Sequence, residues 1–488
     1  MRTKLIKLLT VLISAVLLLT ACGKAAKTPG GNSAVQSTTT GTSFTDAATT
    51  IEMTATAAIT ETTVTGKSTT HKRIIQPTQK PTTQTKVPVR RPAVIQKVTS
   101  DKDNVNTNTT IPTIPTKVTT PVDVPVTEDL KPINPTDYYG RKQLAGLKNQ
   151  NLLRAYERIV SAAESYVSAI NLSDLSLNEF EVAKVFNYYI DDYPQHFWLD
   201  KGYQIQGVPQ NGITKVKYLI MQYAINKDEI TARRKKVDDS VEQLLKGING
   251  DTEPFDRVKI VHDRLVNLVT YDLSTKNPYD LYGAIINGEA VCEGYARAFQ
   301  RLMYKVGVPC LIVKGSSRDI PHAWNLVYLD GEWYHIDATW NDAEVQIGTA
   351  TIPYIDYSYF NITDQQIRID HEVSRDYYII EEDGKPKEYP NILISYELPA
   401  ATGTAMNYFV KTGRNLETPS VTGIKNIMVQ ASNNGEKSVS IRIDSEMNLL
   451  TDSMITKAFS AFQKETGKKV YSEYIQDETN KIIIVFFK

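Results

Sequence analysis

The sequence predicts an α+β fold for the folded part of this chain, on three observations. A helical pattern, with apolar residues three or four apart, begins at Cys292, continues to Val306 and is followed by Gly307. Farther along, two strand-like runs flank the pair Asp330-Gly331, which is a strong signal for a β-hairpin. Near the C-terminus, alternating and helical patterns follow one another in a small β-α-β-β order.

The N-terminus has the pattern of an export signal. A positively charged start precedes an apolar stretch at residues 8–19, which is shorter than a normal membrane span. The stretch ends in the sequence LTAC at residues 19–22, which resembles the lipobox of bacterial lipoproteins. This resemblance implies cleavage before Cys22, lipidation of its thiol and anchoring at the extracellular face of the bacterial cell membrane. The alternative is an ordinary secretory signal that is cut near Ala21.

A long segment at residues 23–135 is expected to be a disordered tether. It is rich in Thr, Ser and Pro and shows no helical or strand periodicity that could bury an apolar face. A flexible coil of this length has a root-mean-square reach of roughly 60 Å. The tether would therefore hold a folded domain away from the membrane.

The charge and cysteine content exclude several classes of protein. The chain has 55 Lys and Arg against 55 Asp and Glu, so nothing suggests a nucleic-acid partner. No His, Cys and Asp cluster has metal-ligand spacing, and we expect no metal and no cofactor. Apart from Cys22, the thiols are Cys292 and Cys310. A disulfide between them is the alternative to a reactive Cys292.

Cys292 is placed where a nucleophilic thiol is favoured. It lies in the first turn of its predicted helix, where unpaired N–H groups and the helix dipole stabilise a thiolate. Its own backbone N–H could also stabilise the oxyanion that forms during acyl transfer. The alternative is a small buried cysteine at a helix start, which is common.

The predicted hairpin brings a histidine and a carboxylate together. With a two-residue loop at 330–331, His322 faces Thr339 and Asp337 faces Trp324 across the strand pair. His322 and Asp337 then share a face as diagonal neighbours, about 7–8 Å apart along the backbone, within reach of a side-chain hydrogen bond. The carboxylate would orient the imidazole ring and stabilise its charged form. His335 lies on the same face and is the competing histidine.

Three motifs resemble the core motifs of the transglutaminase-like superfamily: GEAVCEGYA at 288–296, HAWN at 322–325 and DATW at 337–340. The similarity covers about residues 255–342. It implies a papain-like core, in which the helix bearing the cysteine packs on an antiparallel sheet, and a catalytic triad of Cys292, His322 and Asp337. Many family members have Pro where this chain has Ala338, a position outside the triad.

On this basis the chain divides into five parts. These are a lipoprotein signal peptide at 1–22, the tether at 23–135, a mainly helical region at 136–253, a transglutaminase-like catalytic domain at 254–395 and a small α+β accessory domain at 396–488. Before the catalytic domain we expect helices at about 141–170, at 176–189 with a capping box of Ser176 and Glu179, and at 227–246, and strands at 203–208 and 215–223.

The resemblance implies an enzyme that performs acyl transfer on peptide or protein amides through a cysteine thioester. The outcome would be hydrolysis or deamidation, which we favour slightly, or cross-linking to an amine. Export on a tether points to extracellular or cell-wall peptides and proteins as substrates. Two alternatives remain. One is a non-catalytic surface binding or scaffold lipoprotein with the same fold, and the other is a Cys-His-His amidase in which His335 is the third member.

Overall fold

The computed structural model describes residues 49–54, 94–97, 130–210, 213–318, 320–347, 349–373, 379–380, 386–387, 397–444 and 449–488. The predicted signal peptide, with Cys22, and most of the predicted tether lie outside the described residues. Two short segments of the tether range are strands, β1 (Thr49–Thr54) and β2 (Val94–Lys97). They pair with strands β4 and β19 of the folded part. In the part of the chain that is described, no helix is both long and apolar enough to cross a membrane.

The folded region begins slightly before the predicted boundary at residue 136. Leu130 and Ile133 pack against the main hydrophobic core. The backbone N–H of Ile133 donates to the carbonyl of Tyr304, at 2.8 Å. The last residues of the predicted tether range are therefore part of the fold.

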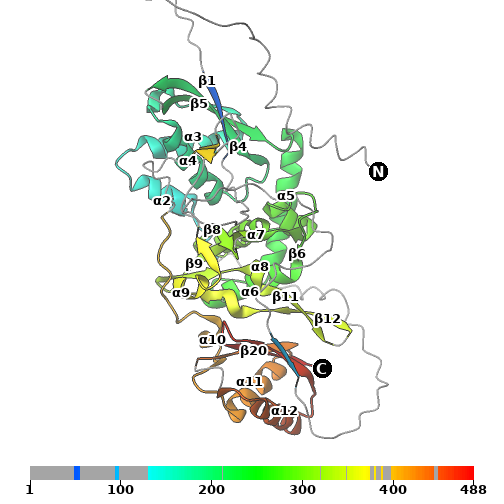
Figure 1. Cartoon of the computed structure of the whole chain (residues 1–488). Coiled ribbons are helices and arrows are strands. Elements are labelled where there is room, and N and C mark those ends of the chain that lie inside the picture. The colour runs from blue at the N-terminus through cyan, green and yellow to red at the C-terminus, as the bar shows by residue number, and fades with distance from the viewer. Residues whose placement is uncertain are drawn as a thin grey trace, which may run out of the picture.

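The N-terminal part of the fold combines helices with an antiparallel hairpin (Figure 1, cyan to green). The two strands predicted here are present, are longer than expected and pair as this hairpin. The elements are α2 (Tyr139–Ala145), α3 (Asn151–Ser165), β3 (Ala169–Asn171), α4 (Glu179–Asp192), β4 (Leu199–Gln210), β5 (Ile213–Tyr223) and α5 (Lys227–Leu245).

Two details of the sequence prediction are wrong in this part. The expected single helix at 141–170 is two helices, because the chain turns between Ala145 and Asn151. The capping box of α4 is formed by Asn178 and Glu181 rather than by Ser176 and Glu179. Ser176 has a left-handed backbone with φ of 54°, which is incompatible with the extended conformation usual for a helix cap.

The central core is a helix layer on an antiparallel sheet, which confirms the predicted α+β fold. Helix α7 begins at Cys292, and its Ala296 packs with Ile312 and Ala323 of the sheet. The sheet has the strand order β13-β10-β9-β8-β14. The elements are α6 (Pro254–Leu268), α7 (Cys292–Lys305), β8 (Cys310–Ser317), β9 (Ile320–Leu329), β10 (Glu332–Ile336), β13 (Phe360–Ile362) and β14 (His371–Val373).

The predicted hairpin register is confirmed as far as strand β10 extends. Leu329 pairs with Glu332, and the pairing continues to Asn325 and Ile336. Beyond Ile336 the prediction of a continuing strand is wrong, because the chain turns into the short helix α8 (Ala338–Asn341). His322 therefore does not face Thr339. Its strand partner is Gly315, on the other side of β9.

The C-terminal part is a small α+β module (Figure 1, orange to red). Helices α11 and α12 cover one face of its sheet, whose order is β17-β18-β20-β19-β2, and enclose a separate hydrophobic core. The predicted β-α-β-β pattern is present, preceded by an additional strand and helix. The elements are β17 (Asn415–Leu416), α11 (Val421–Asn433), β18 (Ser438–Ile443), α12 (Asp452–Thr466), β19 (Val470–Asp477) and β20 (Ile482–Phe487).

The remaining elements connect these parts. They are η1 (Pro135–Asp137), η2 (Ser173–Leu175), β6 (Thr270–Tyr271), η3 (Gly283–Asn287), β7 (Glu289–Ala290), β11 (Asp342–Ile347), β12 (Ala350–Ile355), η4 (Tyr357–Tyr359), α9 (Asp364–Ile367), β15 (Ile379–Ile380), β16 (Pro386–Lys387) and α10 (Tyr408–Lys411).

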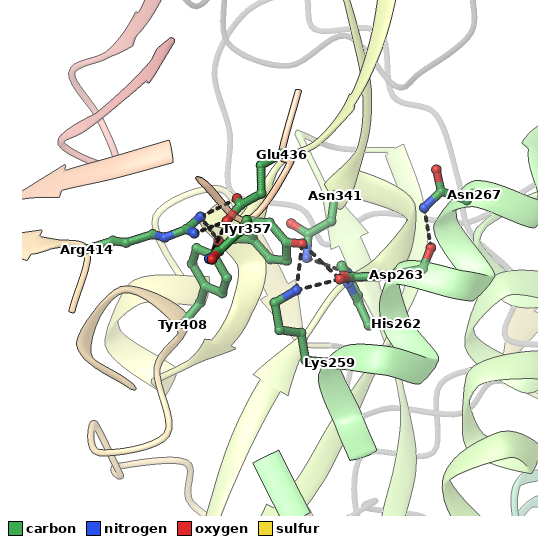
Figure 2. A network of polar contacts seen from close by, with 10 residues as sticks. Lys259, His262, Asp263, Asn267, Asn341, Tyr357, Tyr408, Arg414 and Glu436 are labelled. Carbon is green, nitrogen blue, oxygen red and sulfur yellow. Dashed lines mark hydrogen bonds and ion pairs between the residues drawn. The ribbon is translucent and has the colours of Figure 1, made fainter. Parts of the chain in front are cut away.

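A polar network joins the C-terminal module to the core (Figure 2). Arg414 forms hydrogen bonds with Glu436 and Tyr408, and the Tyr408 ring stacks on Tyr357 with centroids 3.7 Å apart. The Tyr357 hydroxyl in turn contacts Lys259 and Asp263 of α6. Figure 2 also shows Asn341 of α8 beside this cluster, so the network reaches the helix that follows Asp337.

Candidate active site

Cys292 is the first residue of α7, as the sequence predicts, and its side chain is partly exposed. A preceding loop crosses this first turn, where the backbone N–H of Val291 donates to the carbonyl of Pro278. A Cβ at Gly294 would lie 2.6 Å from that carbonyl oxygen, so the loop can approach only because residue 294 is glycine. Cys292 and Cys310 are both free, which removes the alternative of a disulfide between them.

His322 and Asp337 are in direct contact. The His322 Nε2 donates to Asp337 Oδ2 at 2.6 Å, and both side chains are buried. Asp337 reaches this position as the cap of α8, with its Oδ1 accepting from the backbone N–H of Thr339 (3.0 Å) and Trp340 (3.1 Å). The predicted contact therefore forms, but through a helix cap instead of a diagonal pair between two strands.

The contact strongly favours a charged pair. Burial by itself would lower the pKa of His322, but the charge and hydrogen bond of Asp337, together with a hydrogen bond to Cys292, raise it to about 10. Burial would raise the pKa of Asp337, but the charge and hydrogen bond of His322 and a bond from His371 lower it. At neutral pH His322 is therefore an imidazolium. Because Nε2 is bonded to Asp337, Nδ1 is the nitrogen left for Cys292.

Two tyrosines lie near the sulfur. Burial and the charge of the Cys292 thiolate both raise the pKa of Tyr271 and of Tyr279. Tyr279 is 44% exposed and Tyr271 is partly buried. Their hydroxyl groups stay protonated at neutral pH.

The sequence did not indicate His371 as a residue of the site. It lies on β14, and its Nε2 is 3.2 Å from Asp337 Oδ2, the oxygen that also binds His322. Its Nδ1 is 2.7 Å from Asp370 Oδ1. Strand β14 pairs with β8 across a long stretch of intervening chain, and no turn signal in the sequence indicates that pairing. The only local signal is an Asp-His pair, which is not specific.

His322, Asp337 and His371 also form a group that could hold a metal ion, because their donor atoms lie within 4.8 Å of one another. In this group both histidine nitrogens are hydrogen-bonded to the same carboxylate oxygen. A metal ion would have to displace the bond between His322 and Asp337. The expectation that the site uses no metal remains a prediction.

The competing histidine, His335, is bonded elsewhere. Trp324 Nε1 donates to its Nδ1 at 2.9 Å, and its Nε2 donates to Asp364 at 2.8 Å. Burial lowers the pKa of His335 in spite of the Asp364 charge. Both ring nitrogens therefore have partners outside the pair of His322 and Asp337, which disfavours the reading of a Cys-His-His amidase with His335 as third member.

His262 contacts the helix that follows Asp337, although the sequence indicated no partner for this histidine. It is fully buried, and its Nε2 accepts from the Asn341 side-chain amide at 3.0 Å. Asn341 Oδ1 accepts from the backbone N–H of Tyr359, and the Asn341 backbone N–H donates to the carbonyl of Asp337. These bonds fix Asn341 at the end of the short helix α8, and its backbone bond links it to Asp337.

Comparison with known proteins adds three findings. A solved structure titled "Crystal structure of a TGase" is similar at 19% sequence identity with a TM-score of 0.21, covering 29% of this chain and 46% of that chain. Human kyphoscoliosis peptidase is 26% identical over 152 residues, which cover 28% of this chain and 22% of the relative. The mouse protein of the same name is 26% identical over 144 residues, which cover 26% of this chain and 21% of that relative. The chain thus spans only about a fifth of the length of these relatives.

The family model of the transglutaminase-like superfamily matches residues 222–338. The match begins at the end of β5, earlier than the predicted domain start at residue 254, and it includes Cys292, His322 and Asp337. The fold, with a cysteine at the start of a helix on an antiparallel sheet, is the one that the sequence motifs imply. This chain therefore carries, at residues 222–338, a domain of the transglutaminase-like superfamily.

Proposed function

We propose that this protein is a cysteine enzyme that transfers acyl groups from peptide or protein amides through a thioester on Cys292. One observation carries the proposal. A buried His322, held by Asp337 at 2.6 Å, lies close enough to Cys292, at the start of helix α7, for the cysteine to contribute to its raised pKa. An imidazolium beside a thiol at a helix N-terminus favours the thiolate, which is the nucleophilic form.

The reaction begins with attack of the Cys292 thiolate on the amide carbonyl carbon, which forms a C–S bond. The C–N bond then breaks as His322 gives its Nδ1 proton to the departing nitrogen, which leaves as ammonia or as an amine. Water or a primary amine next attacks the thioester and loses a proton to His322. The C–S bond breaks, the thiolate is restored, and the product is a carboxylic acid or a new amide.

Hydrolysis or deamidation is the favoured outcome, because water is always present whereas cross-linking needs a site for a second, amine-bearing substrate. The rival proposal is a surface binding or scaffold protein that uses the fold without catalysis. The two proposals differ in the reactivity of Cys292, since a binding protein has no need of a thiolate.

The rate of Cys292 alkylation by iodoacetamide, measured against pH on the full chain, tests the proposal without a known substrate. Mass spectrometry of the peptide that contains Cys292 separates its reaction from those of Cys22 and Cys310. We expect rapid alkylation at pH 6, where an unperturbed thiol with a pKa of about 8.5 is almost wholly protonated. In His322→Ala the rate at pH 6 should fall, because the imidazolium that favours the thiolate is lost.

Cys310 provides an internal control in the same experiment. It is fully buried, and burial raises the pKa of its thiol well above the usual value, so it should react slowly at every pH. If Cys292 in the unaltered chain reacts no faster at pH 6 than in His322→Ala, the ion pair is absent. The binding-protein proposal would then replace the enzyme.

We further propose that the protein is anchored at the extracellular face of the bacterial membrane by lipid on Cys22, with peptides or proteins at the cell surface as its substrates. The LTAC sequence at residues 19–22 supports this proposal. Metabolic labelling with a fatty acid should place label on the unaltered chain and in the membrane fraction. Cys22→Ala should carry no label and should be absent from the membrane fraction. Labelled Cys22→Ala protein in the membrane fraction would contradict the proposal.

A further inference from the structure

The catalytic carboxylate has a second histidine on its other side. The His371 Nε2 is 3.2 Å from Asp337 Oδ2, and its Nδ1 is 2.7 Å from Asp370 Oδ1. The side chains of His371 and Asp337 are completely inaccessible to solvent, and that of Asp370 is 5% exposed. Acidic groups and histidines therefore alternate in one continuous row, which runs from Cys292 through His322, Asp337 and His371 to Asp370.

Hydrogen-bond chemistry restricts how His371 can bond to two carboxylates at once. An ionised carboxylate can only accept hydrogen bonds, so a ring nitrogen that bonds to one must carry a proton. The pKa of Asp337 is lowered by His322 and that of Asp370 by His371 and Tyr359, in both cases against the effect of burial. Between two ionised carboxylates, His371 can keep both hydrogen bonds only by donating from both nitrogens.

Aromatic rings and a second cation surround His371 and Asp370. The rings of Trp324 and Trp340 lie with centroids 5.1 Å from that of His371, and the Tyr359 ring lies 5.3 Å away. The Arg318 guanidinium lies over the Trp340 ring, 4.8 Å from its centroid, and its charge also lowers the pKa of Asp370. The Tyr359 hydroxyl also donates to Asp370 Oδ2 at 2.6 Å, which holds that carboxylate in place.

We propose that His371 is a positioning residue of the active site, an imidazolium held between Asp370 and Asp337 that keeps Asp337 ionised and oriented toward His322. Asp337 then has all of its main acceptor positions occupied, Oδ1 by the two N–H groups of α8 and Oδ2 by the two histidines. The added positive charge favours the deprotonated form of Asp337 and of the nearby thiol. This inference rests on the proposed thiol chemistry of Cys292.

The variant His371→Gln tests the charge, because glutamine can still donate a hydrogen bond from its amide but carries no charge. Removing a cation disfavours the ionised forms of both Asp337 and the Cys292 thiol. The acid limb of the Cys292 alkylation profile should therefore move up by about one pH unit, which is about a tenfold loss of rate at pH 6. At pH 9 the rate should stay within about twofold of that of the unaltered chain.

His335→Gln is the matched control. His335 is as deeply buried as His371 and also bonds to a carboxylate, that of Asp364, but it does not contact Asp337. Its replacement should leave the pH profile unchanged. The positioning role is refuted if the profile of His371→Gln coincides with that of the unaltered chain. It is equally refuted if both variants lose reactivity by the same factor at every pH.

A second measurement needs neither a stable His371 variant nor a reactive Cys292. In the full chain with ¹⁵N-labelled histidine, and in the same chain with Cys292→Ala, the ring nitrogens of His371 should both carry protons at pH 8. A neutral ring would overturn the inference. A charged ring together with an unreactive Cys292 would instead leave the charge assignment standing and defeat the proposed enzyme, so the two failures are distinguishable.

Discussion

Replacing Cys292 by alanine should abolish turnover of glutamine-containing peptides while the fold stays intact. Removing the nucleophile of a triad costs about 10⁶-fold in kcat, because no thioester can form. The fold should tolerate the change, since Cys292 is partly exposed at the start of α7 and alanine is a good helix former. The measurements are ammonia release, amine incorporation into the peptide, and thermal unfolding.

Cys310→Ala is the control for this prediction. It removes the same chemical group from a fully buried position on β8 that substrate does not reach. It should lower stability through the loss of buried volume but leave kcat nearly unchanged. Turnover in Cys292→Ala that is comparable with that of the unaltered chain would exclude the thioester mechanism.

Replacing Asp337 by asparagine should have the next largest effect, on the order of 10⁴-fold in kcat. Asparagine can still cap α8, because its oxygen can accept from the N–H groups of Thr339 and Trp340. Its amide nitrogen, however, would replace Oδ2 and donate toward His322. The ring would have to accept at Nε2 and carry its proton at Nδ1, which removes the position that receives a proton from Cys292 or from water.

The pH dependence of Asp337→Asn should change in a defined direction. The proposed mechanism needs the charged form of His322, which holds Cys292 as the thiolate, and the pKa of His322 is raised to about 10 mainly by the charge of Asp337. In the unaltered chain, the alkaline limb of kcat should therefore lie near pH 10. Without that charge, burial lowers the pKa of His322, so the limb should move down by several pH units. An unshifted limb would show that Asp337 does not set the protonation of His322.

The directions of the His322 and Asp337 pKa shifts also predict how the stability of the fold depends on pH. His322 has a folded-state pKa above its ordinary value of about 6.5, so its contribution is fully present below that pH and disappears as the pH rises toward about 10. Asp337 has a lowered pKa, and its contribution is present above about pH 4 and disappears as the pH falls further. The pair therefore stabilises the fold most between about pH 4 and 6.5.

The parts of the site that the sequence determined are those encoded by short-range patterns. The helical repeat after Cys292 defines where α7 begins, because apolar residues must recur every three or four positions to face the sheet. The pair Asp330-Gly331 sets the hairpin register, because Asp330 and Gly331 both adopt positive φ in a two-residue turn. These two local rules were sufficient to place Cys292 on its helix and to bring His322 and Asp337 to neighbouring positions.

Only the tertiary structure decided how these residues are held. Asp337 reaches His322 as the cap of α8, because the strand ends at Ile336, and alternation alone does not reveal where a strand stops. His371 arrives through the pairing of β14 with β8, which depends on packing between segments that are far apart in the sequence. Asn341 and His262 meet for the same reason. Local patterns predict which face of a helix or strand a residue occupies. Which side chains form hydrogen bonds with a buried charged group depends on how the whole chain packs.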